Sequence, residues 1–192
     1  MCFYKICLLL AFTFSNASVI AQDRSKHGID QLAKKAFKQG FWLAKYPVTQ
    51  REWTALMDST PFAHHKNGRK KTYLKAVDGL DTSRFPAEQI SREGTKAFLE
   101  KMNSSANREK IDQVFGKNFN FCLPYEDEWE YACRGGLGNN RAFYWGSVLN
   151  GDKANCNGQT PYGTKTQGPF VGHPTLVGAY KKRRRILGAC AI

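Results

Sequence analysis

The sequence has few of the residues that mark metal centres, hydrolytic sites or nucleotide sites. Among 192 residues there are six cysteines and four histidines, and no cysteine pair has the Cys-x-x-Cys spacing of a zinc site. Neither His27 nor His173 stands at a diagnostic spacing from a serine or cysteine nucleophile. No glycine-rich loop has the pattern that cradles phosphate. These absences argue against a zinc module, a serine or cysteine hydrolase and a nucleotide-binding protein.

The chain also lacks a hydrophobic run long enough to cross a membrane. Its most apolar stretch, from Ile6 to Phe14, has about nine residues, whereas a membrane helix needs about 20. Lys5 precedes this stretch, and Val19-Ile20-Ala21 offers small or aliphatic residues for cleavage before residue 22. We therefore predict a signal peptide over residues 1–21 and an exported protein, periplasmic or secreted, with no membrane anchor after cleavage. An apolar N-terminus that is never removed is the alternative.

Acidic residues are scarce relative to basic ones. Asp and Glu number 16 against 29 Lys and Arg, so the formal net charge is +13. The basic clusters at Lys66–Lys71 and Lys181–Arg185 lack the interleaved aromatics of a nucleic-acid module. We interpret the charge as a solvated basic surface that can contact polyanions such as acidic polysaccharide, and we predict no nucleic-acid partner.

Residues 121–136 form the most informative segment: Phe-Cys-Leu-Pro-Tyr-Glu-Asp-Glu-Trp-Glu-Tyr-Ala-Cys-Arg-Gly-Gly. Pro124 holds the residue before it in an extended conformation. The three acids that follow Tyr125 suit a first helical turn, because carboxylates there complement the exposed N–H groups. Trp129, Ala132 and Cys133 share one helical face, and Arg134 with two glycines ends the helix. The acids are therefore interpreted as helix-stabilising rather than catalytic.

Other elements follow from local patterns. An aromatic strand is predicted over residues 41–46, followed by a helix that begins at the Thr49–Glu52 capping box. A second helix begins after Ser91, and an aromatic strand is predicted over 142–146. Residues 22–40 are predicted to be a leader with a short amphipathic helix. Residues 58–84, which include His64 and His65, are interpreted as a polar surface loop.

These motifs resemble the formylglycine-generating enzyme (sulfatase-modifying factor) family. The signature at 121–136 matches its Leu-Pro-Thr-Glu-Ala-Glu-Trp-Glu-Tyr-Ala-x-Arg-Gly-Gly run, except at Tyr125 and Asp127. The resemblance covers residues 41–180 in order. It implies an α+β fold of the C-type-lectin-like class, with few short strands, two to three helices and much irregular structure.

The resemblance also implies a chemistry. The family oxidises a sulfatase cysteine to formylglycine, using two C-terminal cysteines, a copper ion and oxygen, so its partner is a sulfatase peptide. The sequence given does not contain the Gly-Asn-Val-Trp-Glu-Trp stretch that precedes those cysteines. Cys122, Cys133 and Cys156 match core positions instead, and we predict no catalytic residue. One disulfide among these three cysteines and buried thiols are equally compatible with the sequence.

The resemblance points to one candidate metal ligand, Asn155. The matching asparagine in the family helps to hold a calcium ion, but its acidic partner, expected near Gly168, is absent. A turn role for Asn155 is the alternative that we favour. We therefore expect no copper or calcium cofactor in this chain.

Residues 181–192 do not match the family. Ile186–Ile192 can be encoded by a string that, read two bases later, gives Pro-Trp-Gly-Leu-Cys-Asp, a sequence typical of the family at this place. We therefore interpret the basic end as a frameshifted tail on a truncated domain; a divergent basic terminus is the alternative.

Three function classes remain open. The first is a sulfatase-modifying factor domain that is inactive because its catalytic cysteine segment is missing. The second is a non-catalytic, exported, lectin-like binding module. The third is a polyanion or nucleic-acid binder. The sequence alone leaves open whether the chain is an enzyme.

Overall fold

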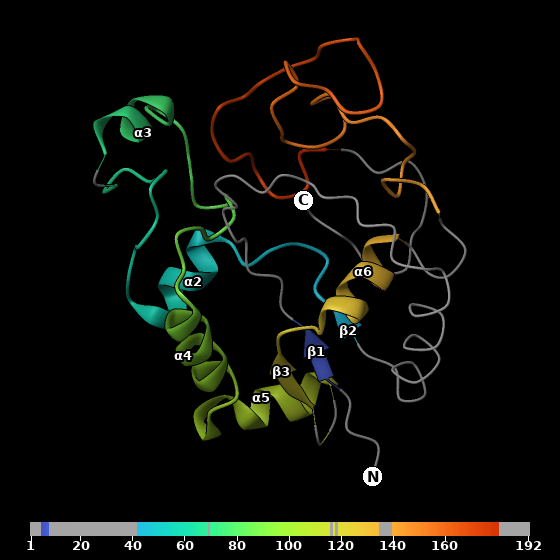
Figure 1. The fold of residues 1–192 in the computed structure, drawn as a ribbon. Coiled ribbons are helices and arrows are strands. Elements are labelled where there is room, and N and C mark those ends of the chain that lie inside the picture. The colour runs from blue at the N-terminus through green and yellow to red at the C-terminus, as the bar shows by residue number, and fades with distance from the viewer. Residues whose placement is uncertain are drawn as a thin grey trace.

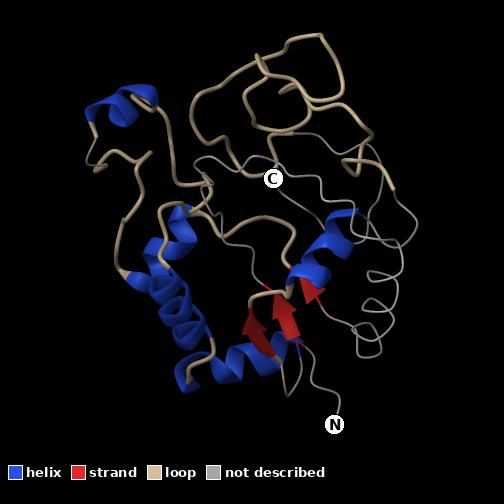
Figure 2. Cartoon of the chain, viewed as in Figure 1, coloured by secondary structure: helices blue, strands red, loops and turns tan. Residues whose placement is uncertain are grey.

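The structure is a computed structural model, and it describes residues 5–7, 42–68, 70–115, 117, 119–134 and 140–180 (Figure 1). This part of the chain has five helices and three short strands. Their bounds are β1 Lys5–Cys7, β2 Trp42–Leu43, α2 Gln50–Met57, α3 Lys71–Ala76, α4 Arg92–Met102, α5 Ser105–Phe115, β3 Asn120–Cys122 and α6 Glu126–Arg134. Figure 2 shows that residues 140–180 form loops and turns. The predicted mixture of helices, short strands and irregular structure is present, but with more helices than the two to three expected.

The three strands form one parallel sheet in the order β2-β1-β3. Ile6 pairs with Trp42 on one side and with Phe121 on the other. The central strand lies inside the predicted signal peptide, so this pairing describes the uncleaved chain. The prediction of export is not tested by it. No helix in the described ranges has the length and apolar character needed to cross a bilayer.

Helix α2 begins where the sequence predicted. The Thr49 side chain accepts a hydrogen bond from the backbone N–H of Glu52, and the Glu52 carboxylate accepts one from the Thr49 backbone N–H at 2.8 Å. This reciprocal capping box satisfies two N–H groups that the first helical turn leaves open. The apolar face of α2 then packs on α4, where the rings of Trp53 and Phe98 stack with centroids 5.1 Å apart. Val48, Phe62 and Ala87 complete this buried core.

Helix α4 is also capped as predicted, because Ser91 accepts a hydrogen bond from the backbone N–H of Gly94. At its other end, the Asn103 amide exchanges two hydrogen bonds with the backbone of Phe121, both at 2.8 Å. This pair of bonds joins the end of α4 to β3. A second small core is formed by Ile111 of α5 and Phe119.

Two local predictions are wrong, and one helix was not predicted. The stretch 58–84 is not simply a surface loop, because it contains α3 and buries Phe62 and Val77. Residues 105–115 form the helix α5, although the sequence there is mostly polar. Residues 142–146 do not form a strand; Phe143 and Gly146 bridge across a tight turn. The predicted leader helix at 22–40 and the tail at 181–192 lie outside the described residues.

The loops at 140–180 are held together by close backbone contacts. The N–H of Gly158 donates to the carbonyl of Pro169, and the N–H of Gly168 donates to the carbonyl of Gly158. A Cβ atom at Gly158 or Gly168 would collide with the carbonyl oxygen of Asn150. Glycine is therefore required at both positions by the close approach of the chain, which explains the glycine-rich composition of this region.

Candidate functional site

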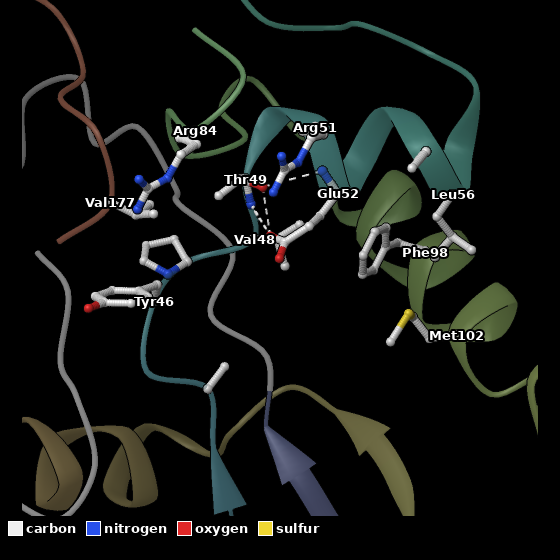
Figure 3. Close-up of a pocket in the computed structure, with 13 residues that line it drawn as sticks. Tyr46, Val48, Thr49, Arg51, Glu52, Leu56, Arg84, Phe98, Met102 and Val177 are labelled. Carbon is white, nitrogen blue, oxygen red and sulfur yellow. Dashed lines mark hydrogen bonds between the residues drawn. The ribbon is translucent and has the colours of Figure 1, made fainter. Parts of the chain in front are cut away.

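A groove of about 690 Å³ lies between the chain that enters α2, helix α4 and the segment around Val177 (Figure 3). Its volume falls within the range of roughly 300–1,000 Å³ that is typical of ligand sites. Backbone hydrogen bonds build its floor. The Ala87 N–H donates to the Val48 carbonyl at 2.7 Å, and the Gln50 N–H donates to the Phe85 carbonyl at 2.9 Å. The floor is therefore fixed before any ligand arrives.

The side of the groove is closed by a segment distant in sequence. The Val177 N–H donates to the Arg84 carbonyl at 3.0 Å, which brings the 177 turn against the residue-84 loop. At the next turn residue, the positive φ of Gly178 allows the backbone to approach the Tyr46 ring, which a Cβ would contact at about 3.1 Å. Tyr46, Arg84 and Val177 consequently lie together at one end of the groove, as Figure 3 shows.

The two ends of the groove differ in chemistry. Arg51 and Arg84 lie near Thr49, whereas Leu56, Phe98 and Met102 line the opposite end (Figure 3). Among the described lining residues, Glu52 has the only carboxylate, and it accepts hydrogen bonds from the backbone N–H and the hydroxyl of Thr49. It is engaged by the helix cap, so one end of the groove keeps a positive character.

The charges of Arg51 and Arg84 affect the pKa of the Asp81 carboxyl. Hydrogen bonds from Ser83 are the main reason that the pKa of the Asp81 carboxyl lies below its usual value, and the charges of Arg51 and Arg84 lower it further. Asp81 is fully exposed, so solvent screens this interaction. The arginines therefore remain able to attract an acidic group of a ligand.

The described residues that line the groove do not include the thiol or imidazole groups most used in redox and acid–base catalysis. Neither cysteine nor histidine is among its lining residues. The site can bind an extended or flat ligand with an acidic part and an apolar part, and its described lining contains no thiolate. This groove was not predicted from the sequence. Its only local signal was the Tyr46-Pro47-Val48-Thr49 run, because Arg84 and Val177 join it through long-range contacts.

The cysteines do not form the disulfide that the sequence left open. Cys122 and Cys156 are thiols, and Cys133 is in a disulfide. Burial raises the pKa of the Cys156 thiol, and a hydrogen bond with the backbone of Gly151 opposes this effect only in part. A raised pKa reduces the thiolate fraction, so Cys156 has the character of a structural thiol.

Asn155, the one predicted metal ligand, has a structural partner. Its side-chain amide donates to the His173 carbonyl at 2.8 Å and ties together two parts of the loop region. The His173 ring stacks on Phe85, with centroids 5.9 Å apart. Within the described residues, no group of three or more His, Cys, Asp or Glu side chains could hold a metal ion. A calcium role for Asn155 therefore stays a prediction without support from neighbouring acids.

The acidic residues in α6 stabilise the helix itself. The buried Glu128 carboxylate accepts a hydrogen bond from the Tyr125 backbone N–H at 2.9 Å, at the start of the helix. Glu130 pairs with Arg134 one turn later at 2.8 Å. Both contacts are of the helix-stabilising kind that the sequence predicted.

Comparison with known proteins gives one match. A family model described as "Sulfatase-modifying factor enzyme 1-like domain" matches residues 13–181. No curated protein and no solved structure matches the chain.

Proposed function

Because this chain belongs to the sulfatase-modifying factor enzyme family, we propose that it uses the family fold to bind a partner and does not itself oxidise cysteine. The observation that carries the proposal is the groove between α2 and α4, which has a cationic end, an apolar end and no thiol or imidazole in its lining. The family's oxidation of a sulfatase cysteine needs thiolates at the substrate. The described lining of this groove contains no cysteine.

The described cysteines do not fit a copper site. Cu(I) prefers paired soft thiolates. Cys133 is already in a disulfide, and the pKa of Cys156 is raised by burial, which disfavours the thiolate that would bind copper. The residues also do not fit calcium, which takes six to eight oxygen ligands. Asn155 gives its amide to His173, and no acidic cluster surrounds it in the described region.

The groove favours a binding module over a domain of the family that neither catalyses a reaction nor binds a ligand. Arg51 and Arg84 suit a carboxylate, and Leu56, Phe98 and Met102 suit an apolar side chain next to it. An extended peptide that carries an acidic residue followed by apolar residues matches both ends. The Cys-x-Pro-x-Arg peptide of sulfatases, which the family resemblance implies as substrate, carries an arginine and no fixed acidic residue, so it complements the two arginines less well. We propose the acidic–apolar peptide as the ligand class of an exported protein.

One experiment with two arms tests this proposal. In the first arm, the purified full chain is incubated with Cu(I), oxygen, a thiol reductant and a Cys-x-Pro-x-Arg peptide, and mass spectrometry looks for formylglycine. We expect no product. Formylglycine produced by this chain alone would contradict the absence of catalysis.

In the second arm, fluorescence polarisation measures binding of a labelled peptide of alternating Asp and Leu. We expect Arg84→Glu to weaken binding by about tenfold, since an ion-pair contact of about 1.4 kcal/mol becomes repulsive. Arg92→Glu is the matched control, because Arg92 is exposed but does not line the groove. Equal weakening in both variants would show that net charge, and not the groove, binds the peptide.

A further inference from the structure

A second feature, away from the groove lining, is a buried polar cluster around residue 64. It joins Gln50 at the start of α2, His64 in the following segment, and Glu88 before α4. Gln50 and Glu88 are each only 2% exposed, and the His64 side chain is 15% exposed. Glu88 Oε1 accepts a hydrogen bond from the His64 backbone N–H at 2.7 Å, and Gln50 Nε2 donates to the His64 carbonyl at 3.1 Å. Both side chains therefore lie against the same residue.

The cluster leaves four buried polar atoms without a hydrogen-bond partner. They are Gln50 Oε1, Glu88 Oε2 and the two ring nitrogens of His64. Folded proteins rarely leave so many buried polar atoms unpaired, and such groups usually mark a missing water, ion or ligand. Two of the four atoms, Gln50 Oε1 and Glu88 Oε2, belong to side chains that the bonds to the His64 backbone already hold in place. The site is therefore built but electrostatically incomplete.

The charge balance points to a cation. A buried carboxylate is unfavourable unless it is paired. Among the described residues, the ion pair found for Glu88 is with His64, and it is a counter-charge only if that imidazole is protonated. A divalent cation would neutralise Glu88 while leaving His64 neutral, which is the state in which imidazole binds metals.

The spacing between the two groups fits a shared metal ion better than a direct hydrogen bond. His64 Nδ1 and Glu88 Oε1 are 3.5 Å apart, beyond the usual range for a hydrogen bond. Two ligands of a tetrahedral zinc ion, each about 2.0–2.1 Å from the metal, are roughly 3.4 Å apart. The imidazole is also held in place, because its ring packs against Tyr73 with centroids 4.6 Å apart.

We propose that His64, Glu88 and Gln50 bind a divalent transition-metal ion, with Zn²⁺ as the representative, through an imidazole nitrogen, a carboxylate oxygen and an amide oxygen. A water molecule supplies the fourth ligand. The imidazole selects a transition metal over calcium or magnesium. The cluster has two ionisable ligands and one amide, so it is not one of the groups of three or more His, Cys, Asp or Glu side chains that are absent from the described residues. The ion joins α2, the residue-64 segment and the chain entering α4, so its role is structural.

His65 provides the matched control. It adjoins His64, but its Nδ1 accepts a hydrogen bond from the Asn67 backbone N–H at 3.2 Å, and its ring meets the edge of Phe62 at 5.8 Å. His65 is therefore occupied elsewhere. Its replacement removes one histidine of similar sequence position without touching the proposed site.

The test is a zinc titration of the full, metal-stripped chain, read as the shift in melting temperature at neutral pH. We expect zinc to raise the melting temperature of the wild type and of His65→Ala. We expect at least half of this shift to be lost in His64→Ala and in Glu88→Gln, which keeps the shape of the side chain. Any zinc bound by the cysteine thiols gives the same background in all four proteins.

Cobalt(II) gives a second readout that does not depend on stability. We expect the wild type and His65→Ala to show the visible absorption of tetrahedral Co²⁺, and Glu88→Gln to lose most of it. If His64→Ala does not fold, the cobalt spectrum of Glu88→Gln shows whether the cluster binds a metal ion. An equal metal response in Glu88→Gln and the wild type would overturn the site. A wild type that binds neither zinc nor cobalt would also overturn it, because His64 and Glu88 would then be no more than a direct contact within the fold.

Discussion

At the scale of single residues, Cys156 distinguishes a structural thiol from a catalytic one. Burial raises the pKa of its thiol above the ordinary value, so the thiolate is a smaller fraction at neutral pH than in an unfolded chain. We predict that iodoacetamide alkylates Cys156 more slowly in the native protein than in urea at pH 7.5. Peptide mass spectrometry after timed quenching measures both rates. Faster labelling of the native thiol would mean that Cys156 is activated, which would reopen the question of catalysis.

Some residue roles could be predicted from the sequence and others could not. Thr49 and Ser91 were assigned as caps because a cap and its partner are three residues apart, so the pattern is complete within one turn. The contact between His64 and Glu88 spans 24 residues. No local pattern encodes such a contact, and adjacent histidines in a polar stretch are usually solvated. The role of His64 therefore required the structure.

At the scale of elements, the capping box of α2 supports both the fold and the groove. Thr49 holds the first turn of α2 and also lines the groove. We predict that Thr49→Ala lowers the free energy of unfolding by about 1 kcal/mol, because the N–H of Glu52 loses its acceptor. Urea unfolding followed by circular dichroism measures the change. Thr49→Ser keeps the hydroxyl and should remain within a few tenths of a kcal/mol of the wild type; an equal loss in both variants would rule out the cap as the cause.

The helices that were not predicted from the sequence, α3 and α5, both have weak sequence signals for helix formation. Helix α3 has no buried residue and no side-chain cap, and α5 buries only Ile111. The i,i+4 ion pair between Arg108 and Asp112 in α5 joins two polar residues that carry no apolar periodicity. In contrast, α2, α4 and α6 were predicted because each combines a start signal with an apolar face. The parallel pairing of β1 with both of its neighbours was not foreseeable, because the three strands are far apart in the chain.

At the scale of the whole molecule, the groove exists because distant segments meet. Its floor comes from residues 46–52, its apolar end from α2 and α4, and its closing edge from residue 177. The sequence indicated the family and the mixed fold class, because the family motifs appear along the chain in the expected order. Apart from the Tyr46-Pro47-Val48-Thr49 run, it gave no indication of the groove, because the motifs do not specify how their loops approach one another. Val177 is the residue of the loops at 140–180 that is found in the described lining, so this end of the loop region closes the edge of the groove.

The net charge of +13 also acts at this scale. Because lysines are spread over most elements, we predict that polyanions bind the chain through its overall field and not through one cluster. Replacing the exposed cluster Lys66, Lys70 and Lys71 by glutamate should lower the salt concentration at which the protein leaves a heparin column. Replacing the equally exposed but dispersed Lys110, Lys153 and Lys165 should lower it by the same amount, because both variants lose the same charge.

Salt-gradient elution of the wild type and both triple variants measures this directly, and circular dichroism confirms that each variant is folded. Column retention of duplex DNA extends the comparison. A diffuse field predicts that DNA and heparin respond alike to salt and to both sets of substitutions, since counterion release depends on charge and not on sequence. A loss confined to the Lys66 cluster would instead identify a local polyanion site. That result would make the residue-66 segment, which adjoins His64, a second functional region of the fold.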